Sequence, residues 1–135
     1  MRLYKGIGTA LAGAIALVFA ATSAPAQQAI DATAALQERS IGSPDAPVTV
    51  IEYFSLTCPH CASFHNDIYG DLKQKYVDTG KVRFVYKEFP RDGVDLRAGM
   101  MARCADPRRY AGLVQVLFKN QPNWTRSSDP VGELA

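Results

Sequence analysis

A pair of cysteines separated by two residues, in Cys58-Pro59-His60-Cys61, gives this chain its clearest capacity for chemistry. The pair lies where an apolar strand pattern gives way to a helical pattern. A thiol at the first turn of a helix faces unpaired backbone N–H groups and the positive end of the helix dipole, and both favour its thiolate. Because the thiolate is the form that attacks disulfides, the motif indicates a redox-active dithiol.

A carboxyl group precedes the motif by a few residues. Glu52 lies inside the apolar stretch of residues 48–54. A carboxylate in an apolar strand is costly unless it is paired, hydrogen-bonded or neutral. The residues alone leave two interpretations open: Glu52 reaches water at a strand end or a sheet edge, or it is a buried carboxyl with a function.

Zinc binding is an alternative use of the same residues. Cys58, Cys61 and His65 have the spacing C-x2-C-x3-H, and Cys104 could supply a fourth ligand. Structural zinc sites usually draw a second ligand pair from another knuckle, whereas only one further cysteine is present here. The redox interpretation is therefore favoured, and we expect His65 to be a half-exposed helix residue rather than a ligand.

The third cysteine and a purely structural disulfide need separate interpretations. Cys104 falls on a predicted helical stripe with Leu96 and Met100, which indicates a small buried side chain or, alternatively, a disulfide partner beyond residue 135. A static bridge between Cys58 and Cys61 would close a very short loop and would stabilise little through chain entropy. A merely structural role for the motif is therefore the weaker hypothesis.

The first residues have the layout of a secretory signal peptide. Arg2 and Lys5 form a basic segment, residues 6–21 are apolar, and Ala-Pro-Ala at 24–26 matches the cleavage pattern. The apolar run is shorter than the ~20 residues that span a bilayer, which disfavours a retained membrane anchor. We expect residues 1–26 to be removed on export to an oxidising compartment, the periplasm.

The chain without this signal is close to neutral. Arg2 and Lys5 are two of the 15 basic residues, so 13 basic residues remain against 13 acidic ones. No basic stripe is left to indicate a nucleic acid as partner. The remaining piece, about 110 residues, suffices for one small domain.

Residues 42–92 have the pattern of a strand–helix–strand unit. Residues 27–41, rich in Ala and Gln, are expected to form a mobile lead-in, and a turn with glycine and proline follows it. Apolar residues predict parallel strands over 48–54 and 82–89. Between the strands, apolar residues recur every four positions and predict a helix that buries them. These residues are Phe64, Ile68, Leu72 and Tyr76.

Residues 93–135 have helical patterns throughout. Leu96, Met100 and Cys104 form one predicted apolar stripe, with Ala98 and Ala102 beside it. A second stripe follows Pro107 and consists of Tyr110, Leu113, Val114, Leu117 and Phe118. Since two parallel strands do not close a stable sheet and the pattern does not return to strand, we expect either that the chain is a fragment or that something else completes its core.

The chain resembles the DsbA-like branch of the thioredoxin superfamily. The resemblance is carried by four segments: Gly42 to Val50, Glu52 to Cys61, Lys81 to Pro90, and Ala102 to Ala105. It implies an α/β fold, with residues 42–135 forming a partial domain: a thioredoxin-like βαβ unit over 42–92 and the start of a helical insertion over 93–135. The cis-proline loop, the second pair of strands and the last helix of such enzymes are expected to be missing.

The resemblance also implies roles for the motif. Cys58 is expected to be the exposed nucleophile and Cys61 the buried resolving thiol, while His60 tunes the redox poise. A protonated His60 would stabilise the Cys58 thiolate and make the disulfide a stronger oxidant. No cofactor beyond the cysteine pair is expected.

The carboxyl group has an implied role as well. By the resemblance, Glu52 is a buried group near Cys61 that shuttles its proton, and Lys87 on the neighbouring strand is its basic partner. Glu88 and Arg83 are the alternatives for this second position.

These roles predict an exported thiol–disulfide oxidoreductase that exchanges disulfides with protein thiols. Its partners are expected to be secreted or unfolded proteins, together with a membrane redox protein that regenerates the dithiol. The direction of the reaction (oxidation, reduction or isomerisation) stays open.

Overall fold

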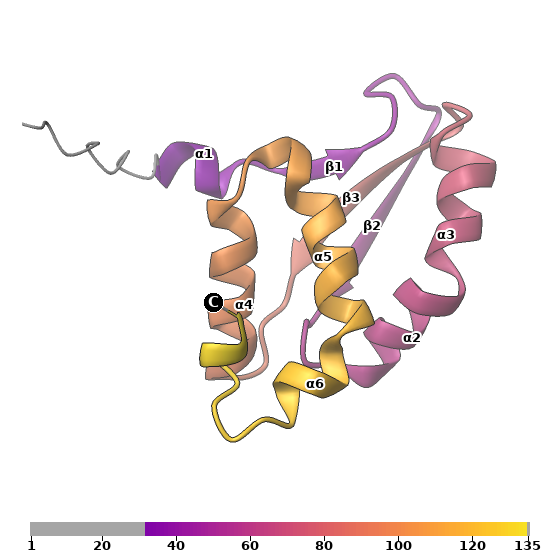
Figure 1. Ribbon diagram of the computed structural model, residues 1–135. Coiled ribbons are helices and arrows are strands. Elements are labelled where there is room, and N and C mark those ends of the chain that lie inside the picture. The colour runs from indigo at the N-terminus through magenta and orange to yellow at the C-terminus, as the bar shows by residue number, and fades with distance from the viewer. Residues whose placement is uncertain (1–31, 135) are drawn as a thin grey trace, which may run out of the picture.

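The computed structural model describes residues 32–134 and has a three-stranded sheet behind a layer of helices (Figure 1). The strands are β1 (Arg39–Ile41), β2 (Val48–Phe54) and β3 (Val82–Glu88), in the order β1-β3-β2. β2 runs parallel to β3, whereas β1 is antiparallel to it. The parallel pair confirms the predicted strand–helix–strand unit. The signal peptide predicted over residues 1–26 lies outside the described residues.

Helices and single turns make up most of the remaining described chain. They are α1 (Ala32–Leu36), α2 (Pro59–Asp67), α3 (Tyr69–Leu72), a π-helical turn (Lys73–Val77), α4 (Gly93–Cys104), a 3-10 turn (Pro107–Arg109), α5 (Tyr110–Lys119), α6 (Gln121–Thr125) and a 3-10 turn (Gly132–Leu134). The helical character predicted after residue 93 is confirmed. Within residues 32–134, no helix has the length and apolar character needed to cross a membrane.

The core lies between the sheet and the helices in front of it. Side chains alternate along β2, so that Val50 and Phe54 belong to the core while Tyr53, 69% exposed, points to the other face of the sheet. Phe54 contacts Phe118 of α5 with 5.7 Å between ring centroids. In Figure 1, α5 lies across the front of β2 and β3, which agrees with this contact.

The helical segment between β2 and β3 buries only part of the predicted face, since Phe64 and Leu72 pack against the core but Ile68 and Tyr76 do not. From the start of α2 onward, its fully buried residues are Ala62, His65, Tyr69 and Val77. Ile68, expected in the core, is 55% exposed, and Tyr76 is also exposed. A step of four residues overshoots one helical turn by about 40°, so a strict repeat of four drifts around the helix. The helix also breaks at Ile68, where φ is −121°, and continues as a π-helical turn.

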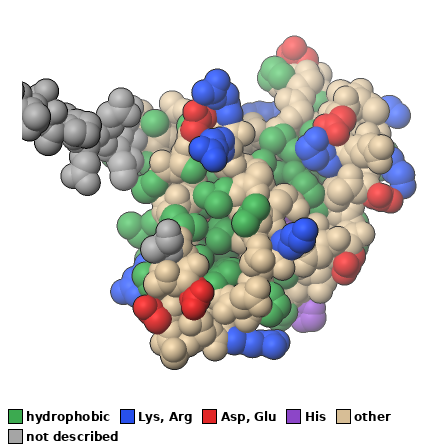
Figure 2. All heavy atoms as spheres, in the orientation of Figure 1, with side chains coloured by type: hydrophobic (Ala, Val, Ile, Leu, Met, Phe, Trp, Pro, Cys, Tyr) green, Lys and Arg blue, Asp and Glu red, His purple; other side chains and the backbone are tan. Residues whose placement is uncertain are grey.

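On α4 the predicted stripe is wrong in the same way. Met100 is 59% exposed, and Leu96 and Cys104 are also exposed. The buried face instead carries Ala98 and Ala102, whose small side chains let the helix approach the core closely. Cys104 is therefore an exposed free thiol and not the small buried side chain that was expected. Figure 2 shows hydrophobic side chains gathered over the region of α4 and α5.

Part of the expected mobile lead-in is ordered. Residues 32–41 form α1 and β1, and β1 pairs with β3 so that Arg39 lies opposite Tyr86. The Arg39 side chain is buried, donates to the carbonyl of Ala34 at 2.9 Å and lies over the ring of Tyr110. The prediction fails for residues 32–41 because a strand of three residues is too short to show an alternating pattern, and the free edge of β3 stabilises it.

Candidate active site

Cys58 caps the N-terminus of α2. Its backbone is extended, with φ −81° and ψ 120°, and Pro59 occupies the first helical position, where a missing N–H leaves no bond unmade. Burial acts to raise the pKa of the Cys58 thiol. The backbone N–H and thiol of Cys61, the backbone N–H of His60 and the positive charge of Arg91 outweigh burial, so the pKa is lowered from its ordinary value. The thiolate predicted from the motif is thus favoured by the helix start.

Cys61 has the opposite character. Burial raises the pKa of its thiol, and the neighbouring Cys58 and Glu52 raise it further, although a hydrogen bond with the Ser55 backbone opposes them. Both cysteines are free and half-buried, and Cys61 packs against the hydrophobic core. The two thiols also differ in their charge environment.

Two side chains from later helices hold the loop before the motif. Asp95 of α4 is buried and accepts the backbone N–H groups of Leu56 at 2.8 Å and Arg91 at 3.0 Å. The amide of Gln121, at the start of α6, donates to the carbonyls of Leu56 at 2.7 Å and Cys58 at 2.9 Å. Asp95 therefore places the Arg91 segment beside the loop that leads to Cys58.

A further link joins the same two loops. Thr57 donates its hydroxyl to Asp92 at 3.0 Å, and Asp92 caps α4 by accepting the backbone N–H of Asp95 at 2.8 Å. Hydrogen bonding to the Asp95 backbone is the largest reason that the pKa of Asp92 is lowered. Neither Asp95 nor Arg91 was identified from the sequence. The Asp-x-x-Asp spacing before a helix, a capping pattern, was the available signal.

Glu52 forms a pair with His65. The His65 Nε2 atom lies 3.0 Å from each Glu52 carboxylate oxygen. The His65 side chain is 0% exposed and that of Glu52 13% exposed. Of the two open interpretations of Glu52, the structure therefore favours the buried carboxyl. The expectation that His65 is half-exposed is wrong, because the buried face of α2 passes through this residue.

Lys87 is not the partner of Glu52. In the parallel register, Glu52 lies opposite Tyr86, and Lys87 is one position further along β3. Successive side chains of a strand point to opposite faces, so Lys87 faces away from Glu52. Its amino group lies 3.2 Å from Glu38 instead.

The two alternatives to Lys87 also have other partners. Arg83 pairs with Glu38 at 2.6 Å. Glu88 accepts hydrogen bonds from Arg103 at 2.7 and 2.5 Å and from the Tyr110 hydroxyl at 2.5 Å. Burial acts to raise the pKa of Glu88, but the bonds from Arg103 and Tyr110 outweigh it and lower that pKa. The Glu88 carboxylate therefore links β3 to α4 and α5 through Arg103 and Tyr110.

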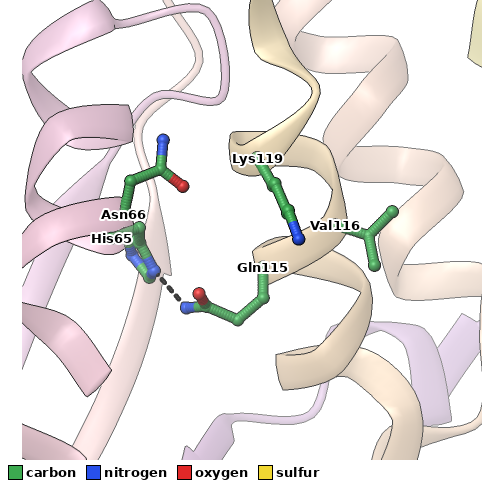
Figure 3. Close-up of a pocket in the computed structure, with 5 residues that line it drawn as sticks. All are labelled: His65, Asn66, Gln115, Val116 and Lys119. Atoms are coloured by element: carbon green, nitrogen blue, oxygen red, sulfur yellow. Dashed lines mark hydrogen bonds between the residues drawn. The ribbon is translucent and has the colours of Figure 1, made fainter.

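The zinc hypothesis loses its histidine. His65 directs Nε2 at Glu52, and its Nδ1 lies 2.5 Å from the amide nitrogen of Gln115, so both ring nitrogens are engaged (Figure 3). Within residues 32–134, no three Cys, His, Asp or Glu side chains come together in a way that could hold a metal ion. Gln115 is a further residue that sequence reasoning missed, and nothing local in its helix marks it.

The arrangement can support thiol–disulfide exchange. Cys58 presents a sulfur whose thiolate is favoured, next to a less acidic Cys61 and a buried carboxyl–imidazole pair. A low thiol pKa at the attacking position favours this exchange. An ionisable group whose charge acts on the second sulfur, here Glu52 on Cys61, suits proton transfer to that sulfur. The exposed His60 side chain adjoins Cys58 in the motif, and its tuning role stays a prediction.

Comparison with known proteins agrees with this chemistry. A candidate protein-disulfide oxidoreductase of Rickettsia bellii is 42% identical over 89 residues, which cover 65% of this chain and 34% of that protein. Disulfide bond formation protein D of Bacillus subtilis is 31% identical over 87 residues, covering 62% of this chain and 39% of that protein. The chain thus spans little more than a third of the length of these relatives.

Solved structures and a family model complete the comparison. The crystal structure of Wolbachia pipientis α-DsbA1 matches with a TM-score of 0.67 and 34% identity, covering 73% of this chain and 51% of that one. The model of a family described as Thioredoxin matches residues 34–135. With its α/β fold and its dithiol at a helix start, the chain belongs to the thioredoxin family and is similar to the DsbA proteins within it.

Proposed function

We propose that this chain carries the dithiol of an exported thiol–disulfide oxidoreductase that exchanges disulfides with protein thiols. The observation that supports this most directly is the opposite shift of the two thiols. The pKa of Cys58 is lowered at the N-terminus of α2, and that of Cys61 is raised one turn further on. The names of the relatives point to the same activity.

The reaction begins with the Cys58–Cys61 disulfide. A substrate thiolate attacks the Sγ atom of Cys58, the S–S bond breaks, and its electron pair goes to the Sγ atom of Cys61. That sulfur takes a proton from the carboxyl group of Glu52. A second substrate thiolate then attacks the substrate sulfur of the mixed disulfide, and Cys58 leaves as a thiolate. The substrate loses two electrons, and the dithiol gains them.

Secreted or unfolded proteins are the proposed substrates, and a membrane redox protein is proposed to reoxidise the Cys58–Cys61 dithiol. Export through residues 1–26 would place the dithiol in the periplasm, where thiols are oxidised. Mass spectrometry of the chain recovered from a bacterial periplasm tests this step. Loss of residues 1–26 supports the proposal, and an uncleaved cytoplasmic product contradicts it.

Trapping of mixed disulfides tests the reaction itself. With a peptide that carries a disulfide, the Cys58 thiolate of Cys61→Ser should attack one peptide sulfur, release the other as a thiolate, and accumulate as a mixed disulfide, because no second thiol of the motif releases it. Cys58→Ser should form no such adduct. Cys104→Ser is the matched control, since this thiol is exposed and lies outside the motif, and it should behave like the unmodified chain. Adducts that form equally without Cys58 would refute the assignment.

A further inference from the structure

We propose that His65 is a positioning residue for this dithiol, which governs the proton on Glu52 and connects that carboxyl group with solvent beside Gln115. This inference rests on the proposed function, because it concerns the proton that Glu52 gives to Cys61. Cys61 and His65 are four residues apart on α2, so they lie on the same side of the helix.

The geometry of the pair is fixed by the rings around it. His65 stacks on Tyr69 and on Phe118, with ring centroids 4.8 and 4.3 Å away and interplanar angles of 25° and 22°. Confined between two rings, the imidazole keeps Nε2 directed at both oxygens of Glu52. A buried carboxylate without a partner is costly, so His65 determines in which form Glu52 is stable.

Gln115 determines which imidazole nitrogen carries a proton. Its amide nitrogen is only a donor, so the Nδ1 atom of His65, 2.5 Å away, accepts. With the Gln115 amide in this orientation, the tautomer that fits both contacts has its proton on Nε2, directed at the Glu52 oxygens. Protonation of Nδ1 requires the amide to turn and present its oxygen. The orientation of the Gln115 amide thus controls whether the Nδ1 atom of His65 can take up a proton.

A pocket connects the Gln115 amide and the His65 ring with the surface. His65, Asn66, Gln115, Val116 and Lys119 line a hollow of about 460 Å³ between α2 and α5 (Figure 3). The other end of the connection is Cys61, since the charge of Glu52 acts on the pKa of that thiol. The hydrogen bonds therefore run from the pocket through Gln115 and His65 to Glu52, whose charge acts on Cys61.

Few other charged groups face His65. Glu52 approaches from β2 and Cys61 from the preceding turn of α2, while Lys119 of α5 lies at the pocket. Tyr69 stacks on the ring and hydrogen-bonds Tyr86 of β3 at 2.5 Å. Burial raises the pKa of both tyrosines, which keeps them neutral at neutral pH. Proton movement near His65 therefore involves Glu52 and the thiols.

Kinetics of disulfide opening test this role. The rate at which dithiothreitol opens the Cys58–Cys61 disulfide should be measured from pH 5 to 9 for the full chain and its variants. His65→Gln keeps a hydrogen-bond donor but does not titrate. Its rate should fall by about tenfold at neutral pH, because Glu52 would lose the imidazole that positions its proton, and its pH profile should shift. Ser63→Ala, an exposed change on the same helix, is the control and should leave the profile unchanged.

A double variant separates a positioning role from general damage. If His65 acts through Glu52, then Glu52→Gln with His65→Gln should be no slower than Glu52→Gln alone. The inference would be overturned if the rate loss of the double variant equalled the product of the two single losses. A His65→Gln pH profile identical to that of the unmodified chain would also overturn it. Should the disulfide of the unmodified chain fail to exchange at all, the proposed function fails instead, which distinguishes the two outcomes.

Nitrogen NMR of the unmodified chain gives an answer that does not depend on how the variants fold. At neutral pH the His65 ring should show a protonated Nε2 and an unprotonated Nδ1. Gln115→Ala removes the donor at Nδ1 and should alter that balance. A ring with its proton on Nδ1, or a ring unaffected by Gln115→Ala, would contradict the proposed connection.

Discussion

The buried carboxylate of Asp95 accepts a hydrogen bond from the backbone N–H of Leu56 at 2.8 Å, across 39 positions of sequence. Leu56 lies two residues before Cys58, so α4 directly supports the loop from which the nucleophile projects. The same carboxylate also accepts the backbone N–H of Arg91 at 3.0 Å. The positive charge of Arg91 helps to lower the pKa of the Cys58 thiol. Support of the loop and electrostatic activation of the thiol thus depend on one side chain.

Asp95→Asn should lower the free energy of unfolding by about 1–3 kcal/mol, because an amide group would place a donor against one of two buried backbone donors. Urea denaturation at pH 7 measures this. Asp71→Asn is the control: Asp71 is exposed and pairs only with Lys75 on the surface, so we expect a change within about 0.5 kcal/mol. Equal stabilities of the two variants would show that Asp95 does not carry the loop.

Arg91→Gln should raise the pKa of the Cys58 thiol, because the substitution removes a positive charge that favours the thiolate. Absorbance of the thiolate near 240 nm, followed during a pH titration of the reduced chain, measures the shift. The difference from the unmodified chain should shrink in high salt, which screens exposed charges. Arg97→Gln, on the exposed part of α4, is the matched control and should leave the titration curve in place.

His60→Ala tests the remaining prediction for the motif. A protonated imidazole beside Cys58 would favour its thiolate, so removal should raise the pKa of Cys58 and make the disulfide less oxidising. Equilibration with glutathione measures the second effect. The backbone N–H of residue 60 is retained in this variant, so the change reports the side chain alone. An unchanged equilibrium would assign the activation to the backbone and Arg91 only.

Stability should fall in acid partly because of Glu88. Its pKa in the folded chain is lowered from the ordinary value of 4.5, after bonds from Arg103 and Tyr110 outweigh burial. A group with a lowered pKa stabilises the fold above its ordinary pKa, and this contribution is lost as pH falls through the folded value. Glu88→Gln should therefore show a shallower decline of unfolding free energy below about pH 4.5. Urea denaturation between pH 7 and 3 checks this, and parallel slopes would contradict it.

The local patterns predicted the parts of the fold that depend on neighbours in sequence. The strands at 48–54 and 82–88, the helix that begins at Pro59, and the position of Cys58 at its cap follow from β-branched runs and from Pro at a first helical turn. The two thiols were assigned opposite characters for the same reason, since distance from the helix end differs by one turn.

The partners of Glu52 were beyond such patterns. Lys87 was the expected partner, but strand register turns Lys87 to the opposite face, and the carboxyl group of Glu52 pairs with His65, which was expected to be half-exposed. The exposed positions of Ile68 and Met100 have a related origin, because apolar spacing does not say which side of a helix meets the sheet.

By itself, the sequence determined that this protein has a reactive dithiol at the start of a helix within a strand–helix–strand unit, because those features arise from residues a few positions apart. Only the tertiary structure decided that His65 pairs with Glu52 and that the charge of Arg91 acts on Cys58. Those contacts join segments 13 to 33 positions apart, and they form only when the helices and strands dock in one particular register.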